Sequence, residues 1–180
     1  SNSILRAIEE DSDDCIGEES VSPHSNTIHI KHKSFKMKDN KSIRLCCDSG
    51  ASNLFVDNPE YLSNKRKTRP IRMKTGSRNA KIYTEIQGDV YLQSNVPNST
   101  KVTKVTNAMY SPNVSGNCLS MSQFDKSGCS IKQKGGKMMI VKDKETLLTA
   151  KLSKDNLHYV TCECLKVSKT KNKSKNVKSV

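Results

Sequence analysis

Short runs of alternating apolar and polar residues recur along most of this chain. Residues 26–33 place isoleucine at alternate positions, residues 42–47 are an apolar run, and residues 100–110 are another strand candidate. Runs of about four to eight such residues, bounded by polar turns, are typical of β-strands. No segment alternates strands with long helical patterns, so the pattern predicts adjoining strands rather than strand–helix–strand units.

A β-hairpin is predicted over residues 69–92. Its turn falls near residues 74–79, where Gly76 and Asn79 can adopt positive φ at little steric cost. The period of two continues from residue 82 to residue 92 through Gly88. The second arm is therefore one long strand, or two strands that bend at this glycine.

The pattern changes after residue 110. Residues 111–124 read as a loop followed by one short helix, which is expected to contain Cys118, Leu119, Met121 and Phe124. A meander of strands then follows, with turns at residues 135–136 and 142–145. In total we expect about eight to ten short strands and one short helix, which favours an all-β, barrel-like fold. The strands of the meander are residues 128–133, 137–143, 146–152 and 157–163.

Charge divides the chain into three parts. Apolar residues make up 33% of the chain and aromatic residues 4%, which suits one domain with a thin core. Residues 1–24 carry seven acids against one arginine, so residues 1–25 are predicted to be an acidic disordered spacer. The domain is expected over residues 26–165. Residues 166–180 are predicted to be a basic disordered tail, either a nonspecific nucleic-acid contact or a solvated spacer.

The seven cysteines follow no recognisable disulfide or zinc-binding spacing, so free thiols in a reducing compartment are expected. Cys162 and Cys164, with His158 nearby, resemble half of a zinc site; alternatively, they are small buried hydrophobes. The other half of such a site would come from Cys129, Cys118 or Cys15. The chain has no run of about 18 apolar residues and no pattern of a secretory signal, so no membrane span or export is expected.

One stretch, IRLCCDSGASNLF at residues 43–55, carries candidate chemistry. Asp48 follows an apolar strand, and a buried carboxylate is costly unless it is paired or hydrogen-bonded. Gly50 permits a sharp turn and the Ser49 hydroxyl can bond to neighbouring backbone, so the loop would hold Asp48 rigidly. Two such loops facing each other would let two carboxylates share one proton and serve as general base and general acid. The alternative is a common turn in which Asp48 caps a backbone amide.

The surroundings of the motif favour catalysis over the simple turn. Residues 51–56 return at once to apolar character, and a glycine-bearing hairpin suited to a mobile flap follows about 25 residues on. In the segments CCDSGAS (46–52), GDVYL (88–92), residues 107–131 and LHYV (157–160), the chain resembles the protease of copia-type LTR retrotransposons. That family lies within the retropepsin class of aspartic proteases.

The resemblance implies a retropepsin-like closed barrel that is active as a homodimer. The chain has one Asp-Ser-Gly, and 180 residues are few for a two-lobed enzyme, so Asp48 of each subunit would form the catalytic pair. Ser49, Gly50 and Ala51 would form the active-site loop, with the Ser49 hydroxyl crosslinking the two loops. Leu119 is the expected brace of that loop. The flap and substrate-binding residues are expected to be Met73, Lys74, Thr75 and Gly76.

By the same resemblance, the parent would be a Gag-Pol polyprotein whose own junctions are the peptide substrates. No cofactor and no metal are implied, because the nucleophile is water, and best activity is expected at mildly acidic pH. The expected location is cytoplasmic, within virus-like particles. Two other functions stay open. One is a catalytically weak or domesticated domain kept for dimerisation or binding. The other is a basic RNA-binding β-domain, suggested by the net charge of +13 but short of aromatic residues.

Overall fold

The computed structural model describes residues 5–8, 28–32, 38–75 and 81–167. These residues form a sheet of 12 strands, one turn of 3-10 helix and one short α-helix, so the prediction of an all-β fold is confirmed. The strands are β1 (Leu5–Ile8), β2 (Ile28–His32), β3 (Lys38–Asp48), β4 (Phe55–Val56), β5 (Ser63–Thr75), β6 (Lys81–Gln93), β7 (Lys101–Tyr110), β8 (Asn117–Ser120), β9 (Ser130–Lys134), β10 (Lys137–Lys142), β11 (Glu145–Leu152) and β12 (His158–Lys166). The helices are η1 (Pro59–Tyr61) and α1 (Met121–Lys126).

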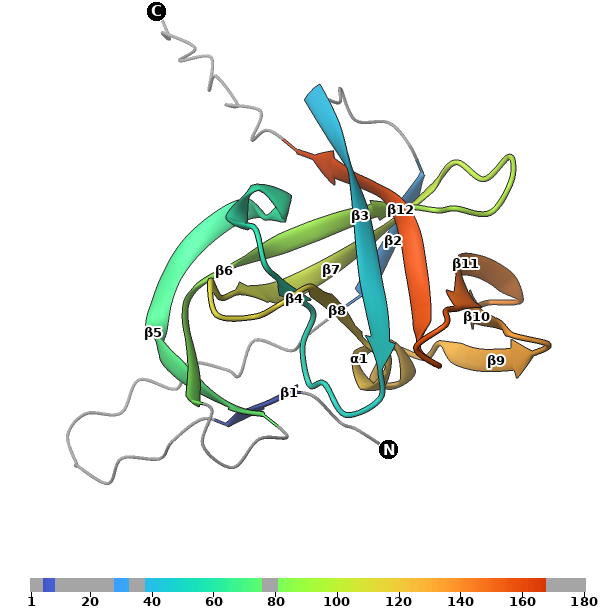
Figure 1. The fold of residues 1–180 in the computed structure, drawn as a ribbon. Coiled ribbons are helices and arrows are strands. Elements are labelled where there is room, and N and C mark those ends of the chain that lie inside the picture. The colour runs from blue at the N-terminus through green and yellow to red at the C-terminus, as the bar shows by residue number, and fades with distance from the viewer. Residues whose placement is uncertain (1–4, 9–27, 33–37, 76–80, 168–180) are drawn as a thin grey trace, which may run out of the picture.

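Part of the sheet closes on itself as a barrel (Figure 1). Strands pair in the order β6, β7, β4, β8, β3, β12, and β12 pairs again with β6 where Cys164 lies opposite Leu92. Closure satisfies the backbone groups that an open sheet would leave at its edges. Outside this ring, β5 and β1 extend the sheet from β6, β11 to β9 extend it from β12, and β2 pairs with β7.

Two parallel pairings interrupt the otherwise antiparallel barrel. β3 runs parallel to β8, with Asp48 opposite Ser120, and β4 runs parallel to β7. Parallel neighbours end at the same edge of a sheet. The loop that follows Asp48 therefore lies beside the first turn of α1, which begins directly after Ser120.

The barrel interior is filled by the apolar members of each alternating strand. In β3, Ile43 and Leu45 are buried while Arg44 between them is exposed, which is the inside–outside alternation that a pleated strand imposes. β12 repeats it, with Val160 and Cys162 inward. Each fully buried leucine or isoleucine adds about 1.5–3 kcal/mol to the free energy of unfolding. The main core also takes in Leu54, Leu62, Val90, Leu92, Leu119, Phe124, Ile140, Leu147 and Leu148.

At Gly88, β6 lies close to the start of β5. A Cβ atom at this position would lie 2.7 Å from the Ser63 carbonyl oxygen and 3.0 Å from the Leu62 Cβ, so no larger residue fits without movement of backbone. β6 continues through this glycine as one strand, and its register with β7 shifts between Gly88 and Val90. Of the two predicted forms, the structure has the single long strand with an irregularity at the glycine.

The two arms of the predicted hairpin pair with each other and the meander is confirmed, while residues 76–80 of the hairpin turn lie outside the described residues. The predicted short helix begins too early. Cys118 and Leu119 belong to β8, which pairs with β3, and α1 starts only at Met121. The Ser120 side chain accepts a hydrogen bond from the Gln123 N–H, which caps the helix and fixes its first residue. The apolar spacing at residues 118–124 is therefore that of a strand running into a helix.

At the termini, the structure adds one element and leaves the rest outside its described residues. Leu5–Ile8 forms strand β1, which the prediction of a disordered spacer over residues 1–25 does not include. β12 runs to Lys166, one residue beyond the predicted domain boundary. Residues 168–180, most of the predicted basic tail, lie outside the described residues. In the described part of the chain, no helix is both long and apolar enough to span a membrane.

Raising the pH above 9 is expected to destabilise the fold through its buried thiols. Burial, assisted by the nearby Cys164 and Glu163, raises the pKa of Cys162 to about 12. A thiol with a higher pKa in the folded than in the unfolded state stabilises the fold while both states are protonated. That stabilisation is lost as the pH rises from the unfolded toward the folded pKa.

At pH 10, each such thiol lowers the free energy of unfolding by about 1.4 kcal/mol relative to pH 8. Urea unfolding of the Cys162→Ala variant at both pH values tests this. The variant loses packing at either pH, but its alkaline loss should be smaller than that of the unsubstituted protein by about the same 1.4 kcal/mol. An identical pH dependence in the two proteins would show that Cys162 does not titrate as its burial requires.

Candidate active site

Asp48 ends β3 and is 7% exposed. The Gly50 N–H donates a hydrogen bond of 2.7 Å to its Oδ1 atom, and the Cys118 Sγ lies 3.9 Å from its Oδ2 atom. A charge-assisted bond from a backbone N–H is among the stronger hydrogen bonds in proteins, and here it offsets part of the cost of burying a carboxylate. The carboxylate is thereby held in one orientation at the end of the strand.

The predicted loop residues surround this carboxylate, and each has a different environment. Ser49 is exposed, Gly50 is half-buried and Ala51 is 1% exposed. Ala51 packs in a small apolar cluster that also contains Phe55, Met109, Val114 and Cys118, with Ile71 of β5 against it. The loop thus presents one polar side chain, that of Ser49, to the outside and anchors itself through Ala51.

Two serines hold the loop by its backbone. The Ser120 hydroxyl donates a hydrogen bond of 2.6 Å to the Ala51 carbonyl oxygen, and the Ser122 hydroxyl donates another of 2.9 Å to the same oxygen. We call this pair the serine clamp. The two hydroxyl oxygens are 3.1 Å apart, and Ser120 also caps α1. The clamp ties the loop after Asp48 to the start of the helix.

Further hydrogen bonds tie this unit to the barrel. The Gln123 side-chain amide in α1 donates to the Thr106 carbonyl oxygen of β7 at 3.2 Å. The Asn53 amide, at the far end of the loop, donates to the Asn107 carbonyl oxygen of the same strand at 3.2 Å. Asn117 donates to the Arg44 carbonyl oxygen at 3.2 Å and accepts from the Asp57 N–H at 3.0 Å. The loop is therefore fixed at both ends to different strands.

Leu119, predicted as the brace of the loop, is fully buried in the main core. It lies opposite Cys47 in the parallel pair β3–β8. The atoms that bond to the loop and to Asp48 come from its neighbours, Cys118 and Ser120. Leu119 supports the loop through strand pairing and core packing, while the direct contacts belong to the residues on either side of it.

Two thiols flank the Asp48 carboxylate. Burial, and next to it the negative charge of Asp48, raises the pKa of both Cys118 and Cys46. Burial also raises the pKa of Cys47 to about 12, with Cys46 as the second cause. At neutral pH these side chains are protonated thiols, so the Cys118 S–H is a donor to Asp48 and no thiolate competes with the carboxylate.

The predicted flap residues lie in and beyond the β5–β6 hairpin. Met73 and Lys74 pair with Ile82 and Lys81, and Thr75 is the last residue of β5. Gly76 lies outside the described residues. Through Ile71, which packs on the cluster of Ala51 and Cys118, this end of β5 lies next to the candidate site.

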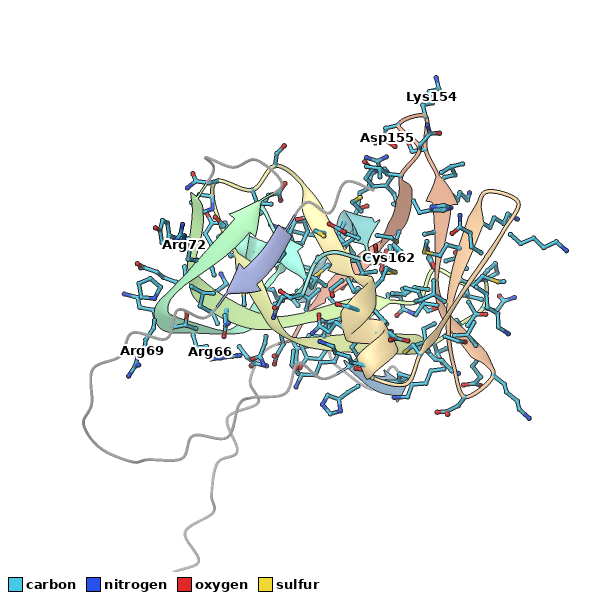
Figure 2. The ribbon with its side chains drawn as sticks, turned by 90° about the horizontal axis from the view of Figure 1, so that it is seen from below. Arg66, Arg69, Arg72, Lys154, Asp155 and Cys162 are labelled. Carbon is cyan, nitrogen blue, oxygen red and sulfur yellow. The ribbon has the colours of Figure 1, made fainter. Side chains whose placement is uncertain are left out.

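β5 is also the most basic element of the described chain. Its sequence, SNKRKTRPIRMKT, has six cations and no acid, and Lys65, Arg66, Lys67 and Arg69 are exposed. Figure 2 shows Arg66, Arg69 and Arg72 spread along this strand, on the opposite side of the molecule from Lys154 and Asp155. The Arg66 guanidinium donates to the Asn107 side-chain oxygen, and the others provide a positive surface beside the hairpin.

The residues of the possible zinc site are distributed along β12. Cys162 and Cys164 are buried in the main core and His158 begins the strand, while Cys15 lies outside the described residues. Among the described side chains, no three of His, Cys, Asp or Glu are grouped so that they could hold a metal ion. The two cysteines of β12 act as small core residues, which was the other reading of their spacing.

Sequence reasoning did not identify the serine clamp or the Cys118–Asp48 contact. The clamp joins residues about 70 positions apart along the chain, so no local pattern reveals it. The available signal was the pair Ser120-x-Ser122 at a helix start, where serine is a favoured capping residue. Its partner, the Ala51 carbonyl, follows only from the parallel pairing of β3 with β8.

Comparison with known proteins gives one positive result. Residues 45–129 match the family model described as Pol polyprotein, beta-barrel domain. This range begins in β3 and ends just after α1, so it contains Asp48, the loop, the hairpin and the serine clamp. The match supports a Pol polyprotein region. No match was found among curated proteins, and none among solved structures.

The serine clamp gives a direct test of what positions the loop. Ser120→Ala removes the helix cap and one bond to the Ala51 carbonyl, so it should lower the free energy of unfolding by about 1–2 kcal/mol. Ser122→Ala removes only a bond to the same oxygen and should cost less than about 1 kcal/mol. Urea unfolding of the two variants measures both. Equal losses would show that the cap and the buried bond of Ser120 contribute nothing beyond the shared acceptor.

Proposed function

We propose that this chain is an aspartic endopeptidase of a Pol polyprotein that acts as a homodimer, with Asp48 from each subunit forming the catalytic pair. The observation that carries the proposal is the Asp48 carboxylate, buried at the end of a strand and oriented by the Gly50 N–H. The match of residues 45–129 to the Pol polyprotein β-barrel supports the polyprotein setting.

The requirement for two subunits comes from the chemistry. The sequence contains one Asp-Ser-Gly, so one subunit supplies one such carboxylate. Activation of water by a base and protonation of a peptide carbonyl by an acid need two groups, and a two-fold axis provides them from identical chains. The exposed Ser49 beside the buried Asp48 is suited to meet its copy across that axis.

The proposed reaction is hydrolysis of a peptide bond with the pair sharing one proton. The ionised carboxylate takes a proton from water as the water oxygen bonds to the carbonyl carbon, and the protonated one donates to the carbonyl oxygen. The C–N bond of the tetrahedral intermediate then breaks as the nitrogen receives a proton from the pair and one hydroxyl of the intermediate returns a proton to it, so the pair is restored and no cofactor is consumed. Activity should fall at low pH, when both carboxyls are protonated, and at high pH, when both are ionised.

The proposed substrates are extended segments of the parent polyprotein, cut within virus-like particles in the cytoplasm. An extended peptide binds an enzyme of this kind by pairing its backbone with a strand. The end of β5, between Arg72 and Thr75, is a strand next to the candidate site and therefore suits that role.

One observation favours a different function. The exposed cations of β5 form a positive surface, and with the net charge of +13 they suit the RNA backbone. A protease that binds RNA only nonspecifically should lose affinity equally when any three exposed cations are neutralised. Replacing Lys65, Lys67 and Arg69 by Gln should then weaken binding of single-stranded RNA no more than replacing Lys132, Lys134 and Lys137 on β9 and β10 does.

Filter binding over a range of salt concentrations measures this comparison. A loss from the β5 variant about tenfold greater than the loss from the β9–β10 variant would favour the RNA-binding function. Similar losses of RNA affinity in the two variants, each with a reduced salt dependence, would show that RNA binds through nonspecific charge attraction alone.

The proposal itself is tested by Asp48→Asn. Asparagine keeps an oxygen acceptor for the Gly50 N–H but cannot serve as base or acid, so hydrolysis of a polyprotein junction peptide should fall by about a thousandfold. Asp125→Asn, at an exposed carboxyl of α1, is the matched control and should retain activity. Turnover is followed by mass spectrometry of the products, and the subunit mass is followed by analytical ultracentrifugation.

Two results would contradict the proposal. Undiminished turnover by Asp48→Asn would place the chemistry elsewhere. A monomer with no turnover at any concentration, with or without a pepstatin-type inhibitor, would favour the alternative of a protease-like domain without catalysis.

A further inference from the structure

Strand β1 pairs with the part of β5 that is proposed to bind substrate. Leu5 lies opposite Thr75, Ala7 opposite Met73 and Ile8 opposite Arg72, in antiparallel register. On its other side β5 pairs with β6, so β1 takes the outer edge. Regular pairing of β5 with β6 resumes at Ile71, after a shift in register that includes Pro70. The paired segment is thus the regular, extended end of the strand.

The position of β1 places it next to the candidate active site. Both views draw β1 between the β5–β6 hairpin and α1 (Figures 1 and 2). Ile71 packs against the cluster of Ala51 and Cys118, and the Cys118 sulfur contacts Asp48. A second strand on the outer edge of β5 is about 4.8 Å from it, which is the spacing of neighbouring strands. β1 therefore occupies the space that a peptide paired with this edge of β5 would occupy.

The charges of the two partners are complementary. The sequence that follows Ile8 begins with Glu9 and Glu10 and carries seven acids up to residue 19. β5 carries six cations and no acid. Opposite charge on two segments favours their association and selects one direction of pairing over the other. In the observed antiparallel register, Ile8, the last residue before the acidic run in the sequence, lies opposite Arg72.

We propose that β1 is a built-in competitor, which occupies the edge of β5 on which extended peptides bind, so that a substrate must displace it. The term substrate rests on the proposed function, whereas the competition for the strand edge does not. The peptides that fit this edge have the character of the segment itself: a short strand in which three of four residues are apolar, followed by acidic residues. Backbone hydrogen bonds supply the affinity, and the acidic flank supplies the preference for basic β5.

The experiment measures binding without turnover. The full chain carrying Asp48→Asn is titrated into a fluorescently labelled peptide of residues 3–10, SILRAIEE, and fluorescence anisotropy gives the dissociation constant. Arg6→Pro and Ala7→Pro are added singly, because alternate residues of a strand point their N–H groups to the same side and one of the two must face β5. Proline removes that N–H and weakens β1.

We expect at least one proline variant to bind the peptide about tenfold more tightly than the parent, because its own strand competes less. Ala7→Val keeps the N–H and favours the strand, so it is the matched control and should bind no more tightly than the parent. A peptide with the two glutamates replaced by glutamine should bind more weakly at low salt. Equal affinity in the parent and in both proline variants would overturn the proposal.

The same variants with Asp48 intact separate this inference from the proposed function. If both hold, the proline variant lowers KM for a junction peptide and leaves kcat unchanged. Tighter peptide binding without turnover in any variant would support the competition and contradict the protease. Turnover with a KM that proline does not change would support the protease and contradict the competition.

Discussion

Parallel pairing of β3 with β8 is the constraint on which the candidate site depends. It brings Asp48 and Ser120 to the same edge of the barrel, although 72 positions separate them in the sequence. Because of that pairing, the helix cap of α1 is also the donor that holds the Ala51 carbonyl, and Cys118 is next to the Asp48 carboxylate. One local turn, in which the Gly50 N–H bonds to Asp48, then completes the orientation of the carboxylate. An antiparallel partner would carry its own turn to this edge and could not start a helix there.

The strands that the sequence predicts are those whose two faces differ. β12 alternates because one of its faces packs in the core and the other meets solvent. Besides β1 and η1, three elements escape prediction for separate physical reasons. β4 has two residues and β8 has four, which is too short for a period, and β8 runs directly into α1. The first half of β5 is a run of cations, and its strand form depends on pairing with β6 rather than on an apolar face.

The residues of the candidate site also fall into those that the sequence predicts and those that it does not. Asp48, Ser49, Gly50 and Ala51 follow from the sequence because the turn chemistry of Asp-Ser-Gly is local. The serine clamp does not follow, because a hydroxyl bonded to a distant carbonyl leaves no mark on spacing. Leu119 was identified by analogy of position, and its place in the core agrees with support of the loop, although the bonds come from Cys118 and Ser120. A role for any of these residues in catalysis stays a prediction.

The Asp48 loop and the outer edge of β5 would behave differently when two subunits assemble and bind a peptide. The loop of Asp48 is already fixed by bonds to β7, β8 and α1, so a dimer that uses it loses little conformational freedom there. The outer edge of β5 is different. Its backbone groups pair with β1 in one subunit, and they would pair with a bound peptide in a complex with substrate. An edge strand needs such a partner, since unpaired backbone groups invite association with other chains. Binding of a peptide therefore exchanges one set of strand hydrogen bonds for another, and the net affinity depends on the difference between the two strands rather than on the full number of bonds formed. β1 belongs to the same chain and is therefore held near this edge at high effective concentration. A peptide has to bind the edge with enough affinity to overcome that competition.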